Sequence, residues 1–206
     1  MEVLIDLHVH TRRYSECSNI DPFRLVGEAV RVGLDGLVLT EHHHQWEADA
    51  LEELLRASGH PDFLLFSAME YTSEEGDILI YGLSPETANA FPAFESAGEV
   101  VARVHRLGGL CVAAHPTRSG FGFDSSIREI PFDGIEVRSV NLQPHEQQLA
   151  GHLAGQLGLP GLAGSDAHRL EDVGTYATAF DAPVRSMADL KERLCHGRFK
   201  MTEKLR

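Results

Sequence analysis

Short apolar runs alternate with longer amphipathic segments along most of this chain. The runs are rich in Val, Ile, Leu and Ala, and such continuous runs are typical of strands that are covered on both faces. In chain order the predicted strands are residues 3–9, 36–40, 63–69, 78–81, 110–114, 134–138, 161–164 and 175–180. This rhythm favours βα units around a parallel sheet, built either as a barrel or as a doubly wound sheet.

The segments between these runs carry helix signals. Asp21 followed by Pro22 predicts an N-cap and a first helical residue, and the apolar face that follows ends near Gly33. Similar patterns predict helices over residues 47–57, 97–107, 144–157 and 187–194.

Length, net charge and cysteine content restrict the number of domains, the class of substrate and the compartment that we expect. Its 206 residues predict one domain, 1–206, and its net charge of −13 makes binding to long nucleic acid unlikely. A small phosphorylated substrate is compatible with this charge. Three scattered cysteines indicate no disulfide framework. The first residues, MEVLIDLHVH, lack a basic region followed by a long apolar one, and no stretch approaches the length of a transmembrane helix, so we expect neither a signal peptide nor a membrane span. We expect a cytoplasmic protein with no membrane partner; the oligomeric state is open.

Side chains that bind metals stand at, or just past, the C-terminal ends of the predicted strands. These side chains are His8, His10, Glu41, His42, Glu70, His115, Asp166 and His168. In an α/β barrel that edge carries the catalytic loops, and residues from many strands converge there. The position of the polar residues therefore favours the barrel.

Two pairs have the i, i+2 spacing that places both side chains on one face of a strand. His8 and His10 form the first pair, and Asp166 and His168 form the second. Imidazole and carboxylate groups are ordinary ligands of divalent metals. Each pair is a weak signal alone, and its position at a strand end strengthens it.

Single residues extend the set. His42 is the preferred ligand of three consecutive histidines, and Glu41 before it is either a partner that orients a ligating imidazole or a solvated loop residue. Glu70 ends a buried strand, where a carboxylate needs a cation or an arginine beside it. Asp77 is a weaker candidate, and His115 ends a strand of small residues.

The motifs DLHVH, TEHH, the glutamate of AMEY, AHP and GSDAH, in this order, resemble those of the PHP (polymerase and histidinol phosphatase) family. The resemblance extends from about Asp6 to His168. It implies a distorted (β/α)7 TIM-like barrel, two or three divalent metal ions (Mn, Fe or Zn) and phosphoester hydrolysis.

The resemblance also implies how ligands divide among metals. His8, His10, Glu70 and Asp166 would bind one ion, Glu70 would bridge to a second held by His115, and His42 with His168 would hold a third. Two positions depart from the family: Glu16 stands where aspartate or histidine is frequent, and Asp77 where histidine is frequent. Both still carry a ligating group, and both changes favour manganese or iron over zinc.

The expected activity is hydrolysis of a small phosphomonoester or nucleotide by attack of a metal-bound hydroxide. The candidates for proton transfer are Asp166, His168 and Glu41, and the candidate phosphate clamps, in order, are Arg118, Arg138, Arg12 and Arg13. Two alternatives stay open. An amidohydrolase-type metal-dependent hydrolase shares the first HxH motif, and a non-catalytic PHP module would bind metal without turnover.

Overall fold

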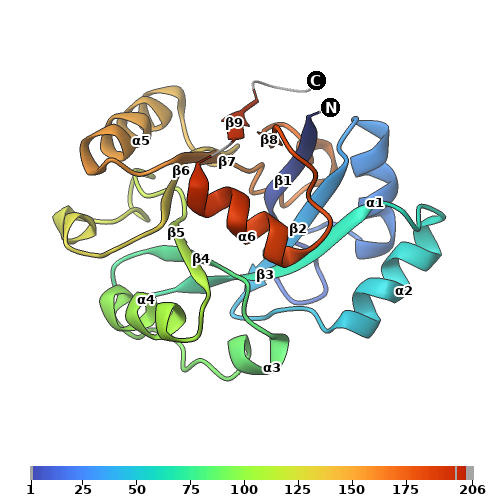
Figure 1. The fold of residues 1–206 in the computed structure, drawn as a ribbon, viewed down its shortest axis with the longest axis horizontal. Coiled ribbons are helices and arrows are strands. Elements are labelled where there is room, and N and C mark those ends of the chain that lie inside the picture. The colour runs from blue at the N-terminus through green and yellow to red at the C-terminus, as the bar shows by residue number, and fades with distance from the viewer. Residues whose placement is uncertain (1, 198, 203–206) are drawn as a thin grey trace.

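A curved, mixed β-sheet organises the chain, and the computed structural model describes it for residues 2–197 and 199–202 (Figure 1). The strands are β1 Val3–Val9, β2 Gly36–His42, β3 Leu64–Thr72, β4 Asp77–Tyr81, β5 Leu110–Ala113, β6 Gly134–Arg138, β7 Gly161–Ala163, β8 Thr178–Phe180 and β9 Phe199–Met201. The helices are α1 Pro22–Arg31, α2 Ala48–Ser58, α3 Pro85–Ala88, α4 Ala97–Arg106, α5 Pro144–Leu157 and α6 Met187–His196, with 3-10 turns η1 Ser125–Arg128 and η2 Leu170–Asp172.

The strand order within the sheet is β7-β6-β5-β4-β3-β2-β1-β8-β9. Parallel pairs join β1 to β2 to β3 and β5 to β6 to β7, whereas β4 runs against both of its neighbours and β8 runs against β1 and β9. The sheet curls until β7 contacts β1 and β9. At this seam the Asp166 amide donates to the His8 carbonyl at 2.7 Å. The sheet is therefore a nearly closed barrel, as predicted.

The interior of the barrel is apolar at one end and polar at the other. Its apolar part joins strand residues such as Leu7, Val38 and Leu79 to Leu190 and Leu194 of α6, which lies across the front of the barrel in Figure 1. The polar end lies at the opposite side of this packing, where β1, β2 and β3 finish. Helix α6 thus closes one mouth and leaves the other for a site.

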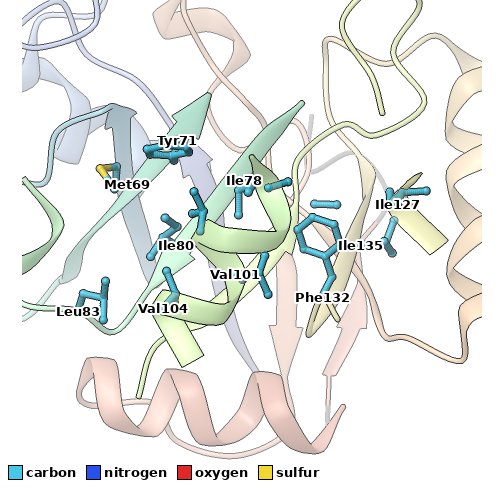
Figure 2. Close-up of a cluster of buried hydrophobic side chains, with 14 of the residues drawn as sticks. Met69, Tyr71, Ile78, Ile80, Leu83, Val101, Val104, Ile127, Phe132 and Ile135 are labelled. Atoms are coloured by element: carbon cyan, nitrogen blue, oxygen red, sulfur yellow. The ribbon is translucent and has the colours of Figure 1, made fainter. Parts of the chain in front are cut away.

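The outer face of the sheet is covered by helices in two apolar clusters. One cluster packs α1 and α2 against β2, and the other packs α4 and α5 against β3 to β6. Figure 2 shows part of the second cluster, in which Ile78 and Ile80 of β4 face Val101 and Val104 of α4. Because both sheet faces are buried, the strands read as continuous apolar runs in the sequence.

Local signals place the helix ends. The Asp21 side chain accepts a hydrogen bond from the Phe23 amide at 3.1 Å, which confirms the predicted N-cap of α1. Gly59, Gly158 and Gly197 end α2, α5 and α6 in the left-handed conformation, which glycine adopts without steric cost. The five predicted helices and eight predicted strands are all observed, with shifts of a few residues at their ends.

Several elements differ from the predictions. Strand β8 runs antiparallel to β1, where a parallel sheet was predicted. Strand β4 is antiparallel, because a tight turn at Ser73 and Gly76 returns the chain directly beside β3 without an intervening helix. The short helix α3 and strand β9 were not predicted from the sequence. Both contain three or four residues, too few to show a hydrophobic period.

Candidate metal centre

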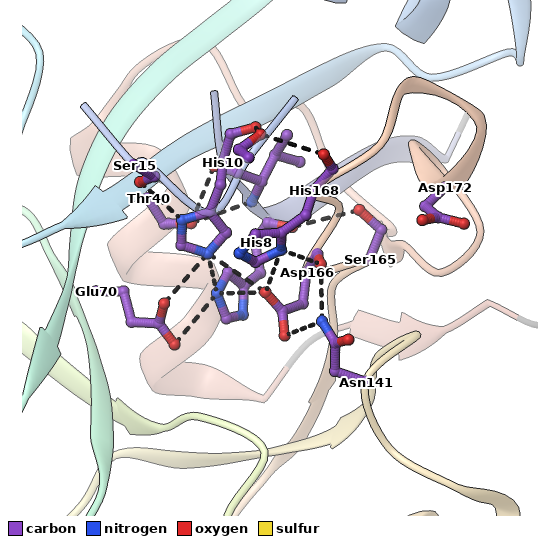
Figure 3. A network of polar contacts seen from close by, with 12 residues as sticks. His8, His10, Ser15, Thr40, Glu70, Asn141, Ser165, Asp166, His168 and Asp172 are labelled. Carbon is purple, nitrogen blue, oxygen red and sulfur yellow. Dashed lines mark hydrogen bonds and ion pairs between the residues drawn. The ribbon is translucent and has the colours of Figure 1, made fainter. Parts of the chain in front are cut away.

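Eight of the nine residues predicted to bind metal converge at the polar end of the barrel. They come from the ends of β1, β2 and β3, the start of β4, and the segments after β5 and β7: His8, His10, His42, Glu70, Asp77, His115, Asp166 and His168. Asp77 joins the group because β4 is antiparallel, so its first residue lies at the edge where β3 ends. Figure 3 labels His8, His10, Glu70, Asp166 and His168 of this group and marks contacts among the residues drawn.

Glu70 lies at the middle of the cluster. Its Oε1 is 3.0 Å from His115 Nε2, and its Oε2 is 3.0 Å from His42 Nδ1 and 3.2 Å from His10 Nε2. Asp166 Oδ1 lies 3.3 Å from the Nε2 atoms of both His8 and His10. These contacts link every strand end that contributes to the site.

The hydrogen bonds of His8 and His10 set the tautomer of each ring. His8 Nδ1 is 2.9 Å from the Glu136 carboxylate, so this nitrogen carries a proton and donates it. His10 Nδ1 is 3.2 Å from Ser15 Oγ, whose own hydroxyl donates to Glu41 at 2.6 Å, so His10 Nδ1 is also the donor. When both rings are neutral, each presents a lone pair on Nε2.

These two Nε2 atoms are only 2.9 Å apart. Two lone pairs at this separation repel unless a cation or a proton lies beside them, so the arrangement fits a metal ligand pair. Two buried carboxylate oxygens, Glu70 Oε2 and Asp77 Oδ1, have no partner with hydrogen-bond geometry among the described residues, although His42 Nδ1 and His10 Nε2 lie 3.0 and 3.2 Å from Glu70 Oε2. The donor set therefore fits a divalent cation.

The ligating atoms form four groups of three in which all atoms lie within 4.8 Å of one another. The groups are His10–His42–His168, His8–His115–Asp166, His8–His10–Glu70 and Glu70–Asp77–His115. The shared members His8, His10, Glu70 and His115 make the groups adjacent. The arrangement thus offers more than one position for a cation.

Electrostatics favour the charged form of several fully buried side chains in the cluster, whereas burial favours the neutral form of His168 and Asp77 by lowering the pKa of His168 and raising that of Asp77. Burial alone would lower the pKa of His10, but Asp166 and Glu70 beside it raise it to about 9. Burial also acts against His115, whose pKa Glu70 and Asp166 likewise raise to about 9. Against the effect of burial, His8 and His10 hold the pKa of Glu70 and Asp166 below the ordinary value.

The backbone is strained at two of the ligands. His115 has φ of 29° and Asp166 has φ of 54°, which are unusual for residues with a side chain. Such conformations cost about 1–3 kcal/mol and persist where the surroundings hold them. Asn141 Nδ2 holds Asp166 by donating to its carbonyl at 3.0 Å and to its carboxylate at 2.7 Å.

Sequence reasoning did not identify several residues that hold the ligands. Glu136 orients His8 and accepts the His115 amide at 2.8 Å, and Ser15 connects His10 to Glu41. The signal for Glu136 was available: it is a lone carboxylate in the apolar run 134–138, where burial demands a partner. Ser15 and Asn141 lie in loops, where serine and asparagine are common for other reasons.

Buried Asp6 ties three segments together. Its carboxylate accepts the amides of Ser165 at 2.7 Å, Gly174 at 3.1 Å and His8 at 3.3 Å. Burial raises the pKa of Asp6 to about 6, against the effect of these hydrogen bonds. Asp6 thus anchors the segment after β7, which carries Asp166 and His168, to β1.

Other predicted site residues lie outside the cluster. Glu16 is exposed and belongs to none of the four groups found in the described part of the chain. Glu41 is buried and accepts hydrogen bonds from the amide and hydroxyl of Thr11, from Ser15 and from Trp46 Nε1. Glu41 therefore supports ligands rather than facing the group.

The four arginines lie in different surroundings. Arg12 is exposed and pairs with Asp21, and Arg13 is exposed with its guanidinium over the Tyr14 ring. Arg118 is half-buried, and its amide donates to the His115 carbonyl at 2.9 Å. Arg138 is half-buried and ends β6, two residues after Glu136.

The fold resembles those of several solved structures. PsfC from Pseudomonas syringae PB-5123 matches with a TM-score of 0.73 and 21% identity over 95% of this chain and 94% of PsfC. A two-domain protein from Bacteroides vulgatus ATCC 8482, described as containing a predicted PHP-like metal-dependent phosphoesterase, matches with a TM-score of 0.76 and 19% identity over 99% of this chain and 65% of that protein. The lesion-specific endonuclease PfuEndoQ from Pyrococcus furiosus matches with a TM-score of 0.70 and 15% identity over 98% of this chain and 58% of the endonuclease.

A family model described as PHP-associated matches residues 144–199, which include α5 and the segment with Asp166 and His168. No curated protein matches the sequence significantly. The fold is a barrel whose polar end gathers histidine, aspartate and glutamate side chains that could hold metal ions. The family match covers residues 144–199, and the shared fold agrees with the barrel that the resemblance to the PHP family predicts. Among the described residues, no helix combines the length and apolarity needed to cross a membrane.

Proposed function

We propose that this protein is a metal-dependent phosphoesterase that hydrolyses a small phosphomonoester or a nucleotide. The observation that carries the proposal is the convergence of eight histidine, aspartate and glutamate side chains in one cluster with four possible three-ligand groups. Bound divalent cations would supply Lewis acidity for activating water and for neutralising the charge of a phosphoryl group. His8, His10, His42, Glu70, Asp77, His115, Asp166 and His168 would hold them.

Within this proposal the side chains have separate tasks. The His168 side chain is 26% exposed and borders the buried ring of His10, so among the buried and half-buried ligands it would hold a cation at the side open to solvent and substrate. Asp166 is buried and held by Asn141, which suits a ligand of fixed orientation. Glu41, with both oxygens accepting hydrogen bonds, supports a positioning role.

Two arginines are the stronger candidates for the phosphate. Arg118 lies one turn beyond His115, and Arg138 ends the strand that carries Glu136. A guanidinium matches two phosphate oxygens at once, so either would orient the substrate at the cluster. Arg12 and Arg13, which line a surface pocket of about 320 Å³ with Asp21 and Phe23, are further candidates.

A substrate assay tests the proposal. Protein supplied with Mn²⁺ should hydrolyse p-nitrophenyl phosphate or a nucleotide, and the His8→Ala/Asp166→Ala variant should lose this activity while it keeps its circular dichroism spectrum. The matched control is His60→Ala/Asp62→Ala, which changes exposed residues before β3 at the other end of the barrel. Undiminished activity in the His8/Asp166 variant would contradict the proposed site.

The same assay separates the alternatives. A binuclear amidohydrolase bridged by a carbamylated lysine needs a lysine at the cluster, but the described lysines, Lys191 and Lys200, lie on α6 and β9. Turnover of amides or lactones without phosphoesters would favour that class, and bound metal without turnover would indicate a binding module.

The net charge of −13 supports a small substrate over a long nucleic acid, and a duplex DNA substrate tests this preference.

A further inference from the structure

The two ends of the cluster have different ligand chemistry. The histidine end consists of His10, His42 and His168, which offer three imidazole nitrogens. The carboxylate end consists of Glu70, Asp77 and His115, which offer two oxygens and one nitrogen. Metals differ in their preference for these donors: imidazole suits zinc, whereas carboxylate suits manganese and magnesium.

The two ends share no ligand and meet at Glu70. The His10 ring lies between the rings of His42 and His168, with centroid distances of 4.5 and 4.4 Å. At the other end His115 Nε2 lies 3.0 Å from Glu70 Oε1 and 3.9 Å from Asp77 Oδ2. Glu70 spans the gap, since its Oε1 faces His115 and its Oε2 faces His42 and His10.

Asp77 determines the character of the carboxylate end. Its Oδ1 is buried without a hydrogen-bond donor in the described structure, and its side chain is 17% exposed. A histidine at this position would give the end two nitrogens and one oxygen, close to the chemistry of the histidine end. With aspartate, this end offers two oxygens and one nitrogen, against three nitrogens at the histidine end.

We propose that the centre selects a different ion at each end: Zn²⁺ at the histidine end and Mn²⁺ at the carboxylate end. The inference rests on the proposed metal centre and goes beyond it by assigning an ion to each position. In general, zinc binds nitrogen and oxygen sites more tightly than manganese does. The selection therefore concerns the ratio of zinc affinity to manganese affinity, which differs between the two ends. The preference for zinc over manganese is larger at the histidine end.

Metal competition tests this selection without measuring activity. Metal-free protein receives one equivalent of Zn²⁺ and an excess of Mn²⁺, and its metal content is measured after gel filtration. Crystals of the same sample are examined by anomalous diffraction at the zinc and manganese absorption edges. The expected result is a zinc peak among His10, His42 and His168, and a manganese peak beside Asp77.

Two variants should separate the ends. His168→Ala should reduce zinc retention and leave manganese, whereas Asp77→Ala should reduce manganese retention and leave zinc. Each loss should reach roughly tenfold in affinity or more, because removing even an outer partner of a ligand costs about 10–100-fold. His44→Ala and Glu74→Ala are matched controls, since neither residue belongs to the four groups, and both should retain both metals.

The outcomes distinguish this inference from the proposed function. A zinc peak at the carboxylate end, or equal loss of both metals in both variants, would overturn the selection while leaving the phosphoesterase proposal intact. Selective metal binding without phosphoester turnover would support the selection and contradict the proposed activity. Failure to bind either metal would overturn both.

Discussion

Hydrogen bonds behind two histidines decide which of their nitrogens face the cluster. Glu136 fixes His8, and the Ser15 hydroxyl, held by Glu41, fixes His10. Ser15 also accepts the His42 amide at 3.1 Å, so one hydroxyl orients two candidate ligands. Partners of this kind raise the basicity of a ligating ring and restrict its motion.

Replacing Ser15 tests this arrangement. In Ser15→Ala, His10 Nδ1 and the His42 amide lose their acceptor and Glu41 loses a donor. We expect the free energy of unfolding of the metal-free protein to fall by about 1–3 kcal/mol. Metal affinity should fall by roughly 10–100-fold. Urea unfolding and metal titration measure the two effects.

The control for this variant is Ser58→Ala, which removes a hydroxyl that donates to the Leu55 carbonyl at the end of α2. This change should leave metal affinity unaltered. Wild-type metal affinity in Ser15→Ala would show that Ser15 does not position His10.

At the scale of elements, the contact between β1 and the segment after β7 holds the site together. Gly164 makes this contact possible, because a Cβ atom there would lie 2.7 Å from His8 Cβ and 2.8 Å from the His8 amide nitrogen. Backbone on β1 cannot move aside without moving His8 itself. A glycine at this position therefore lets Asp166 approach the two histidines.

Gly164→Ala should separate β1 from the segment that carries Asp166. We expect a loss of about 1–3 kcal/mol in the free energy of unfolding, as for overpacking, together with weaker metal binding. Gly155→Ala is the matched control: a Cβ on this exposed residue of α5 meets nothing within 4 Å. It should raise stability by about 0.5–1 kcal/mol. Thermal and chemical unfolding distinguish the two, and equal stability would contradict the steric account.

At the scale of the whole molecule, the barrel buries carboxylates that a metal would compensate. Asp6, Glu70, Glu136 and Asp166 are all at most 1% exposed. Protonated histidines partly compensate them in the metal-free protein. Since the pKa values of His10 and His115 rise from 6.5 to about 9, their stabilising contribution is complete below about pH 6.5 and is lost as the pH rises through about 9.

Metal removal should therefore destabilise the fold in a pH-dependent way. Mn²⁺ at 100 times its Kd should stabilise the protein by about 2.7 kcal/mol. At a fixed metal concentration, the increase in the free energy of unfolding should be larger near pH 8 than near pH 6. The cation must displace the protons on His10 and His115, and this competition weakens as the pH rises. Differential scanning calorimetry with and without a chelator measures this. A larger gain at the lower pH would contradict the assigned ligands.

The sequence predicted much of the site because its signals are local. Strand ends that carry His8, Glu70 and His115 are visible as apolar runs followed by a single polar residue. The supporting residues were not visible in the same way. Ser15 and Asn141 act on ligands from other segments, and their loop positions alone give no sign of it.

The sequence by itself determined the order of strands and helices, the barrel class and the identity of the candidate ligands, because hydrophobic period and strand-end position are properties of neighbouring residues. Only the tertiary structure decided which ligands meet. The reversal of β4 brings Asp77 to the edge where β3 ends, and the closure of β7 onto β1 brings Asp166 within 3.3 Å of His8 and His10. Both depend on contacts between segments far apart in the chain, so the division into a histidine end and a carboxylate end exists only in the folded protein.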